Sequence, residues 1–204
     1  MRKSKKFIYL ISPNKINSKI FYINLEKILK TKKIYFFQLR LKREKKVKII
    51  QIAKKIKKLT KKYGTKLIIN DDPNLAIKIN SDGCHIGQKD FDIKKARKIL
   101  KNKILGVTCH NSLNLAKKAI KNKADYLAFG AFYSSRTKKI KYKAGFKILN
   151  SAKKLTKIPL IAIGGINNKN YKKLLLNNAN FLAISGYIWN NDKYKPLEAL
   201  NKIK

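Results

Sequence analysis

Short apolar runs alternate with lysine-rich amphipathic stretches along the whole chain, and this rhythm constrains the fold more than any other feature. The apolar runs carry no polar alternation, which is typical of strands buried on both faces of a parallel sheet. Eight such runs are expected to form strands, at residues 7–11, 34–39, 66–70, 83–86, 104–108, 125–130, 159–164 and 180–185. Parallel pairing with helical crossovers is therefore the predicted arrangement.

The segments between these runs carry apolar residues at helical spacing. Within residues 47–64 the apolar positions recur every three or four residues, at Ile49, Ile50, Ala53, Ile56 and Leu59. Gly64 is a suitable stop for that helix. Similar patterns occur at residues 93–100, 113–120, 147–155 and 170–177. Strand then helix, about eight times in 204 residues, predicts an α/β protein with one (β/α)8 TIM barrel domain over residues 1–204. A doubly wound open sheet is the alternative.

The charge of the chain is extreme, with 51 Lys and Arg against 10 Asp and Glu and a formal net charge of +41. Such a charge attracts nucleic acid or anionic membrane surfaces. However, only five of the basic residues are Arg, and base readout favours Arg interleaved with aromatic residues. We therefore interpret the lysines as a compositional bias on solvent faces and expect no specific nucleic-acid partner. A polyanion-binding protein on a barrel scaffold stays as an alternative of a different functional class.

The N-terminus begins with basic residues, but the apolar run at 7–11 is too short for a signal-peptide core, and Pro13 follows it. No run has the length of a membrane span. Cys84 and Cys109 are the only cysteines. They are too few for a disulfide framework and suit a reducing compartment. The expectation is a cytoplasmic protein with no membrane partner.

Unusual polar side chains collect at the ends of the predicted strands, where barrels of this kind carry their chemistry. Gln38, Arg40 and Lys42 come at the end of the second run. Alternation along an extended segment places them on the side opposite Leu39 and Leu41. A guanidinium fork, an ammonium and an amide facing one way suit a phosphate or a diphosphate. The alternative is a strand end that is basic only because the protein is basic.

Acidic residues are rare in this chain, yet Asp71 and Asp72 directly follow the third run, and Asp90 comes shortly after the fourth. Asp72 before Pro73 is typical of a helix N-cap, which leaves Asp71 as the available carboxylate. Mg²⁺ binds through one or two carboxylates together with substrate phosphates. Because Asp71 and Asp90 come from neighbouring strand ends beside phosphate-binding cations, they are predicted to bind Mg²⁺.

Gly164-Gly165 and Ile184-Ser185-Gly186 stand at the ends of the last two runs. Barrels commonly bind a phosphate at these two loops through backbone N–H groups that only small residues leave accessible. The loop after the sixth run contributes Ser135, Thr137 and Lys138. Its hydroxyls and its cation suit a second phosphate and a departing group. Tight turns and ordinary loop composition are the alternative interpretations.

The pairs Cys84-His85 and Cys109-His110 could be read as zinc ligands. Adjacent strand residues point to opposite faces of a sheet, so one pair does not easily supply two ligands. The spacing also fits no common zinc pattern. We therefore predict no zinc site and expect Cys84 to be a small core residue.

In chain order, the motifs QLRLK, IINDD, DGCHIGQKD, ILGVT, DYLAFGAFYSSRTKK, IPLIAIGGI and LAIS resemble those of the thiamine phosphate synthase (thiamine-phosphate pyrophosphorylase) family. The resemblance runs from about residue 7 to residue 188. It implies a (β/α)8 barrel transferase that joins hydroxymethylpyrimidine diphosphate to a thiazole phosphate and releases pyrophosphate. It also implies phosphorylated small molecules as the partners, and it leaves a homo-oligomer open.

The same resemblance implies roles for individual residues. The pyrimidine diphosphate would be bound by Gln38, Leu39, Arg40, Leu41, Lys42, Asn70, Thr108 and Lys138. The thiazole phosphate would be bound by Ser135, Arg136, Thr137, Gly165, Ile184 and Ser185. Mg²⁺ would be bound by Asp71 and Asp90. The chain departs from the family pattern where Thr108 replaces a usual Ser, Ser134 a common Pro and Ser135 a usual Thr, and where Arg136 is unusual.

The implied reaction is dissociative. Arg40, Lys42 and Lys138, together with Mg²⁺, would neutralise the leaving pyrophosphate, and the thiazole nitrogen would capture the pyrimidine cation. No protein nucleophile or general base is required for bond formation, so the protein supplies positioning and electrostatics. A related barrel family, the thiazole tautomerases, shares the phosphate site but commonly lacks the paired carboxylates, and it is the nearest alternative.

Overall fold

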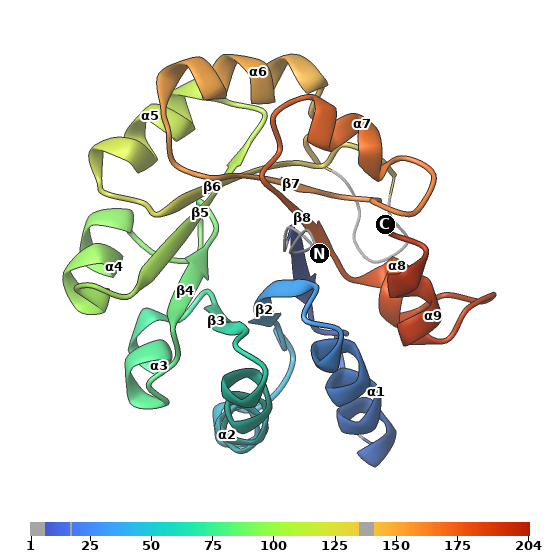
Figure 1. Cartoon of the computed structure of the whole chain (residues 1–204). Coiled ribbons are helices and arrows are strands. Elements are labelled where there is room, and N and C mark those ends of the chain that lie inside the picture. Colours follow the sequence, from blue (N-terminus) through green and yellow to red (C-terminus); the bar gives the residue numbers. More distant parts are fainter. Residues whose placement is uncertain (1–6, 17, 135–140) are drawn as a thin grey trace.

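The computed structural model describes residues 7–16, 18–134 and 141–204. Eight parallel strands form a closed barrel in the order β1 to β8 (Figure 1). They are β1 (Ile8–Ile11), β2 (Ile34–Leu39), β3 (Lys66–Asn70), β4 (Gly83–Ile86), β5 (Ile104–His110), β6 (Tyr126–Gly130), β7 (Leu160–Ile163) and β8 (Phe181–Ile184). The barrel closes where Ile8 pairs with Leu182 and Leu10 pairs with Ile184. This closure confirms the predicted barrel and excludes the open sheet.

Helices surround the barrel as an outer ring (Figure 1). They are α1 (Lys19–Lys30), α2 (Lys46–Lys62), α3 (Pro73–Lys78), α4 (Ile93–Leu100), α5 (Leu113–Lys121), α6 (Phe146–Leu155), α7 (Tyr171–Leu176), α8 (Gly186–Trp189) and α9 (Pro196–Asn201). In the part of the chain that the structure describes, no helix combines the length and the apolar character needed to cross a membrane.

Seven of the strands begin and end within one residue of their predicted limits, and β5 is the exception. It continues to His110, two residues past the predicted end. The pairing of β5 with β6 shifts between Thr108 and His110, which is the sign of a bulge that re-aims side chains at a strand end. The predicted stop of α2 is confirmed, because Gly64 has a φ of +64° just beyond Lys62.

Two apolar layers explain why the strands carry no polar alternation. Ile8 and Leu10 of β1 point outward and pack in the layer between the strands and the helices. Tyr9 and Ile11 belong to a second cluster, which fills the inside of the barrel together with Phe36, Ile68, Tyr126, Ala128, Ile161 and Ala183. Each large apolar side chain that is fully buried in these layers contributes roughly 1.5–3 kcal/mol.

Side-chain caps start several of the helices that follow the strands. The carboxylate of Asp72 accepts a hydrogen bond from the N–H of Leu75 at 2.8 Å, and Asp92 and Ser112 cap α4 and α5 in the same way. Such caps are worth about 1 kcal/mol each. These caps start the helices that follow β3, β4 and β5, so the loops at the C-terminal ends of those three strands are short.

Candidate active site

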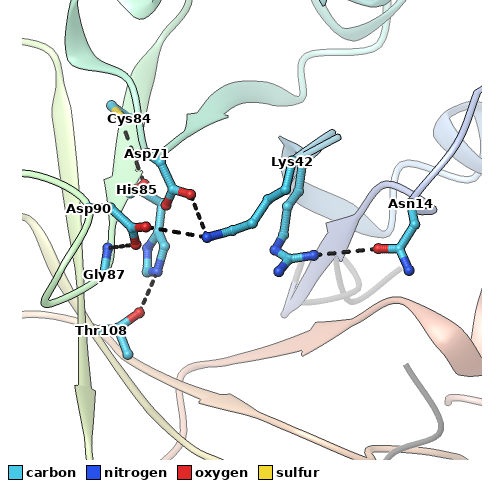
Figure 2. A network of polar contacts seen from close by, with 9 residues as sticks. Asn14, Lys42, Asp71, Cys84, His85, Gly87, Asp90 and Thr108 are labelled. Atoms are coloured by element: carbon cyan, nitrogen blue, oxygen red, sulfur yellow. Dashed lines mark hydrogen bonds and ion pairs between the residues drawn. The ribbon is translucent and has the colours of Figure 1, made fainter. Parts of the chain in front are cut away.

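Three charged side chains converge at the C-terminal ends of neighbouring strands. Lys42 follows β2, Asp71 follows β3, and Asp90 lies in the loop after β4. The Lys42 Nζ lies 2.7 Å from Asp71 Oδ2 and 3.3 Å from Asp90 Oδ1. Figure 2 shows the ammonium group reaching the two carboxylates from the opposite side of the site. The geometry therefore gathers two carboxylates around one positive charge.

The backbone explains why the side chains of Asp71 and its neighbour Asp72 have different contacts. Asp71 has a φ of +66°, a conformation that Asp adopts more readily than most residues. Its N–H donates to the carbonyl oxygen of His85 at 2.7 Å, which ties it to β4. Asp72 caps α3 and also pairs with Lys46 at 2.9 Å. The predicted N-cap role of Asp72 is therefore confirmed, and Asp71 is left facing Lys42.

Asp90 is held by a turn that begins at Gly87. The Gly87 N–H donates to Asp90 Oδ2 at 3.1 Å. A Cβ at position 87 would lie only 2.3 Å from that oxygen, so the close approach requires glycine. The turn leaves Asp90 Oδ1 for the Lys42 ammonium.

The three charges shift one another's proton affinity. Burial and the nearby charge of Asp90 raise the pKa of Asp71, although Lys42 acts in the opposite direction. Burial also opposes the charge of Asp90, but its contacts with Asp71 and Lys42 outweigh burial and lower the pKa of Asp90. Burial likewise disfavours the charged form of Lys42, yet both carboxylates raise its pKa above the usual value. Because two like charges lie together, a cation between them favours the ionised form of both.

Arg40 lies beside this cluster and is anchored from β1. Its backbone N–H donates to the hydroxyl of the buried Ser12 at 2.9 Å. Its guanidinium donates to Asn14 Oδ1 at 3.4 Å, and Asn14 is labelled at the right of Figure 2. The arrangement holds the backbone of Arg40, and within the described part of the chain its guanidinium has donors left for an anion beyond the bond to Asn14.

The predicted alternation along residues 38–42 is present. Leu39 and Leu41 are buried in the layer beneath the helices, whereas Arg40 and Lys42 lie at the mouth of the barrel. Gln38 also points inward but is only 3% exposed, and its Nε2 donates to the hydroxyl of Tyr9 at 3.0 Å. The amide of Gln38 therefore lies deeper in the barrel than the two cations.

Beneath the charged cluster lies a polar interior that the sequence analysis did not predict. His85 Nε2 lies 2.8 Å from Thr108 Oγ1, and His85 Nδ1 lies 3.1 Å from the hydroxyl of Tyr126. Burial, with the positive charges of Arg40 and Lys42, lowers the pKa of His85 to about 4, so the ring is neutral at pH 7. The signal that could have found it is the inward position of His85 between two outward residues of β4.

The two cysteines and the ring of His85 lie on opposite sides of the barrel wall. Cys84 and Cys109 are fully buried outside the barrel wall, in agreement with the expectation for Cys84. Burial raises the pKa of the Cys109 thiol to about 12, and it also raises that of Cys84. Both ring nitrogens of His85 are hydrogen-bonded to hydroxyl groups.

On the opposite side of the barrel, the predicted phosphate loops pack tightly against the loop after β6. Gly165 has a φ of +61°, and a Cβ there would lie 2.2 Å from the carbonyl oxygen of Ser134. The hydroxyl of Ser185 donates to the carbonyl oxygen of Ser12 at 3.1 Å, and Ile184 is buried. The glycine at 165 is therefore required by packing, whatever it binds.

The remaining predicted residues divide into two groups. Asn70 ends β3 and is paired in register with His85, so it lies between the charged cluster and the polar interior. Ser135, Arg136, Thr137 and Lys138 lie outside the residues that the structure describes. The structure thus brings Arg40, Lys42, Asp71, Asp90, Asn70 and Thr108 to one end of the barrel.

Comparisons with known proteins point to a single family. The family model described as thiamine monophosphate synthase matches residues 8–188. The thiamine-phosphate synthase of Pelagibacter ubique is 66% identical over 201 residues, which cover 98% of this chain and 97% of the relative. The thiamine-phosphate synthase of Rhodospirillum centenum is 36% identical over 185 residues, with coverage of 90% and 89%.

A solved structure from the comparisons has a similar fold. The thiamine phosphate pyrophosphorylase of Pyrococcus furiosus superposes with a TM-score of 0.85 at 25% sequence identity, covering 98% of this chain and 94% of that protein. The similarity in fold therefore covers nearly the whole chain.

Proposed function

Because the chain belongs to the thiamine monophosphate synthase family, we propose that it joins hydroxymethylpyrimidine diphosphate to a thiazole phosphate and releases pyrophosphate. In the reaction the bond between the pyrimidine methylene carbon and the diphosphate oxygen breaks, and its electron pair leaves with pyrophosphate. The lone pair of the thiazole nitrogen then forms the new carbon–nitrogen bond. The product is thiamine phosphate.

The observation that carries this proposal is the contact of Lys42 with both Asp71 and Asp90, at 2.7 Å and 3.3 Å. A diphosphate leaving group needs positive charge beside it as its own charge develops, and preorganised charges supply this at little reorganisation cost. Lys42 and Arg40 place an ammonium and a guanidinium at one strand end. A thiazole tautomerase has no diphosphate to stabilise, so the cluster favours the synthase reaction.

The donor set also fits Mg²⁺. The carboxylates of Asp71 and Asp90 both face the ammonium of Lys42. When substrate phosphates complete the coordination of Mg²⁺, the protein usually contributes only one or two carboxylates. Asp71 and Asp90 would hold the ion. When bound, Mg²⁺ neutralises negative charge on the diphosphate.

The chain's own residues would orient both substrates. Arg40 and Lys42 bind the diphosphate, and Asn70 and Thr108 donate hydrogen bonds to it from the ends of β3 and β5. Gln38 meets the pyrimidine ring deeper in the barrel, with Leu39 and Leu41 fixing the segment that carries the cations. Lys138 stabilises the departing pyrophosphate.

The thiazole phosphate would lie across the barrel from the charged cluster. Its binding set is Ser135, Arg136 and Thr137 from the loop after β6, with Gly165, Ile184 and Ser185 from the ends of β7 and β8. Separate sites for the two substrates hold the thiazole nitrogen in line with the methylene carbon. Such positioning replaces a general base in this reaction.

The test is an assay of the purified protein with both substrates, with and without Mg²⁺, scored for thiamine phosphate by chromatography. We expect product that requires both substrates and the metal. Absence of product, with conversion of a thiazole phosphate isomer in a parallel assay, would instead identify a tautomerase. Absence of both activities would overturn the enzymatic proposal.

A further inference from the structure

A chain of hydrogen bonds crosses the inside of the barrel under the charged cluster. Gln38 Nε2 donates to Tyr9 Oη at 3.0 Å, and Tyr9 Oη lies 2.8 Å from Tyr126 Oη. Tyr126 Oη lies 3.1 Å from His85 Nδ1, and His85 Nε2 lies 2.8 Å from Thr108 Oγ1. Figure 2 shows the last of these contacts. This chain of hydrogen bonds thus connects Gln38 with Thr108, which are both assigned to the pyrimidine diphosphate.

The first bond favours one direction for the others, because each buried hydroxyl has one proton to donate. Because Tyr9 accepts from Gln38, its own proton is available to the next oxygen, that of Tyr126. Tyr126 in turn has its proton left for His85 Nδ1. A ring that accepts at Nδ1 carries its proton on Nε2, from which it donates to Thr108. Thr108 accepts that bond and keeps its hydroxyl proton for another acceptor.

Packing fixes the two tyrosines in this arrangement. Tyr9 and Tyr126 are 2% and 1% exposed, and their rings meet edge to face with centroids 5.7 Å apart. Gly106 makes the room, since a Cβ at that position would lie 1.8 Å from Cζ of Tyr126. Buried hydroxyl groups without partners are costly, so the two hydroxyls favour staying hydrogen-bonded. The packing of the two rings holds the same arrangement.

We propose that Tyr126 is a positioning residue: through His85 it sets Thr108 as a hydrogen-bond donor to the diphosphate oxygen that gains charge in the reaction. This inference rests on the proposed function for the identity of the acceptor. It requires no contact between Tyr126 and either substrate. The side-chain amide of Gln88 also donates to the carbonyl oxygen of Thr108, which fixes the main chain of that residue.

The direct test is the protonation pattern of His85. The chain has only two histidines, so long-range ¹H–¹⁵N spectra are simple, and a His110→Gln variant assigns them. We expect His85 of the native protein to carry its proton on Nε2. Tyr126→Phe removes one hydroxyl at nearly constant volume, and it should give a mixture of both tautomers. A native ring with the proton on Nδ1, or an unchanged pattern in Tyr126→Phe, would overturn the proposal.

Kinetics supply the second arm. Tyr126→Phe should lower kcat about tenfold, since hydrogen bonds to charged groups are worth that much or more. The KM for the pyrimidine diphosphate should change by less than about threefold, because the bond strengthens as charge develops. In a Thr108→Val background the same change should cost less than about twofold, since both act through one hydroxyl. Fully additive losses would show that Tyr126 acts by another route.

Tyr171→Phe is the matched control. Tyr171 is also buried, and its hydroxyl donates to the carbonyl oxygen of Lys204 at 2.7 Å, outside the site. Its removal should leave the tautomer and kcat unchanged. If Tyr126→Phe does not fold, Tyr9→Phe interrupts the same chain one bond earlier and should shift the tautomer in the same direction. An inactive native protein would overturn the proposed function, while the spectra would still decide the hydrogen-bond chain.

Discussion

The ammonium group of Lys42 lies 2.7 Å from Asp71 Oδ2, and this ion pair joins the end of β2 to the end of β3. With Asp90 at 3.3 Å, the pair forms a cluster in which the carboxylates outnumber the ammonium by one. An additional cation therefore finds two carboxylates within reach here, on a protein whose formal charge is +41. Two carboxylates close together are unusual in a chain with only 10 Asp and Glu.

The metal assignment predicts the behaviour of Asp71→Asn and Asp90→Asn. Each change keeps the shape of the side chain and removes one charge, so the fold should persist. Turnover should fall roughly a hundredfold or more, as when one group of a charge-stabilising site is removed. The Mg²⁺ concentration needed for half-maximal rate should rise.

Glu26→Gln is the control for these variants. Glu26 forms a surface ion pair with Lys62 at 2.8 Å, away from the strand ends, and its loss should leave the Mg²⁺ dependence unchanged. Calorimetric titration of Mg²⁺ in the presence of pyrophosphate measures affinity without turnover. An unaltered Mg²⁺ requirement in both aspartate variants would remove the metal assignment.

Comparing Gly165→Ala with Gly64→Ala should separate the cost of steric crowding from the cost of backbone strain in the free energy of unfolding. Gly64 and Gly165 have nearly the same φ, +64° and +61°, but only Gly165 would place a Cβ against another backbone atom, at 2.2 Å. Gly64→Ala should therefore cost about 1–3 kcal/mol from strain alone. Gly165→Ala should cost about 1–3 kcal/mol more, as in overpacked cores.

Urea unfolding of both variants measures the two costs, and substrate titration adds the functional comparison. Gly165→Ala should weaken binding of the thiazole phosphate, while Gly64→Ala should not. Equal stability losses in the two variants would contradict the packing argument. Unchanged thiazole phosphate affinity in Gly165→Ala would remove Gly165 from the second substrate site.

The sequence predicts the barrel well because its evidence is local. Strand limits follow from apolar runs, and the separate tasks of Asp71 and Asp72 follow from the Asp-Pro pair that starts α3. The polar interior is different. Tyr126 and Tyr9 are 117 residues apart and meet only because the barrel closes, so a tyrosine in an apolar run looks like ordinary core. The hydrogen bond between Thr108 and His85 joins residues of β5 and β4 that are 23 positions apart in the sequence, and no local pattern reveals it.

Arg97 should be a stability residue with no role in turnover. Its guanidinium donates to the carbonyl oxygens of Lys103 and Lys123 at 2.9 Å and 2.8 Å. It also pairs with Asp125 at 2.5 Å. These bonds tie the end of α4 to the starts of β5 and β6, at the face opposite the site. Arg97→Lys keeps the charge but not the planar fork, and it should lower the free energy of unfolding by about 1–3 kcal/mol.

The control for Arg97→Lys is Lys98→Ala, since Lys98 is exposed on the same helix. Lys98→Ala should change the free energy of unfolding by less than about 0.5 kcal/mol. Both variants should keep native kcat. A large loss of kcat in a folded Arg97→Lys protein would contradict the purely structural role.

Asp72 should make the stability depend on pH in the acid range. Burial disfavours its charge, but Lys46 and the Leu75 N–H outweigh burial and lower its pKa. A lowered folded pKa means that Asp72 stabilises the protein above its unfolded pKa, and that this contribution is lost as pH falls through the folded pKa. Asp72→Ala should therefore destabilise by about 1 kcal/mol near pH 7. Urea unfolding at a series of pH values should show the difference from the native protein shrink below about pH 4.

The final prediction concerns the positive charge of the helices. The side chains of Lys54, Lys55, Lys58 and Lys61 are exposed on α2, whereas Ile56 of the predicted apolar stripe is buried. Replacing all four lysines by Gln should leave kcat nearly unchanged at physiological salt, because exposed charges are screened beyond about 8 Å. The loss of the contact between Lys55 Nζ and the ring of Tyr22, at 5.7 Å from its centroid, should cost no more than about 0.5–1 kcal/mol.

At low salt the same variant should bind both substrates more slowly, because the field of the whole protein steers anions toward the site. Stopped-flow association rates at two ionic strengths test this directly. The interpretation of the lysines as a compositional bias fails if the quadruple variant loses most of its activity at physiological salt with an unchanged melting curve. In that case the exposed face of α2 would be a binding surface, and binding of a polyanion along it would become the leading explanation. A steep dependence of that binding on salt concentration would identify it.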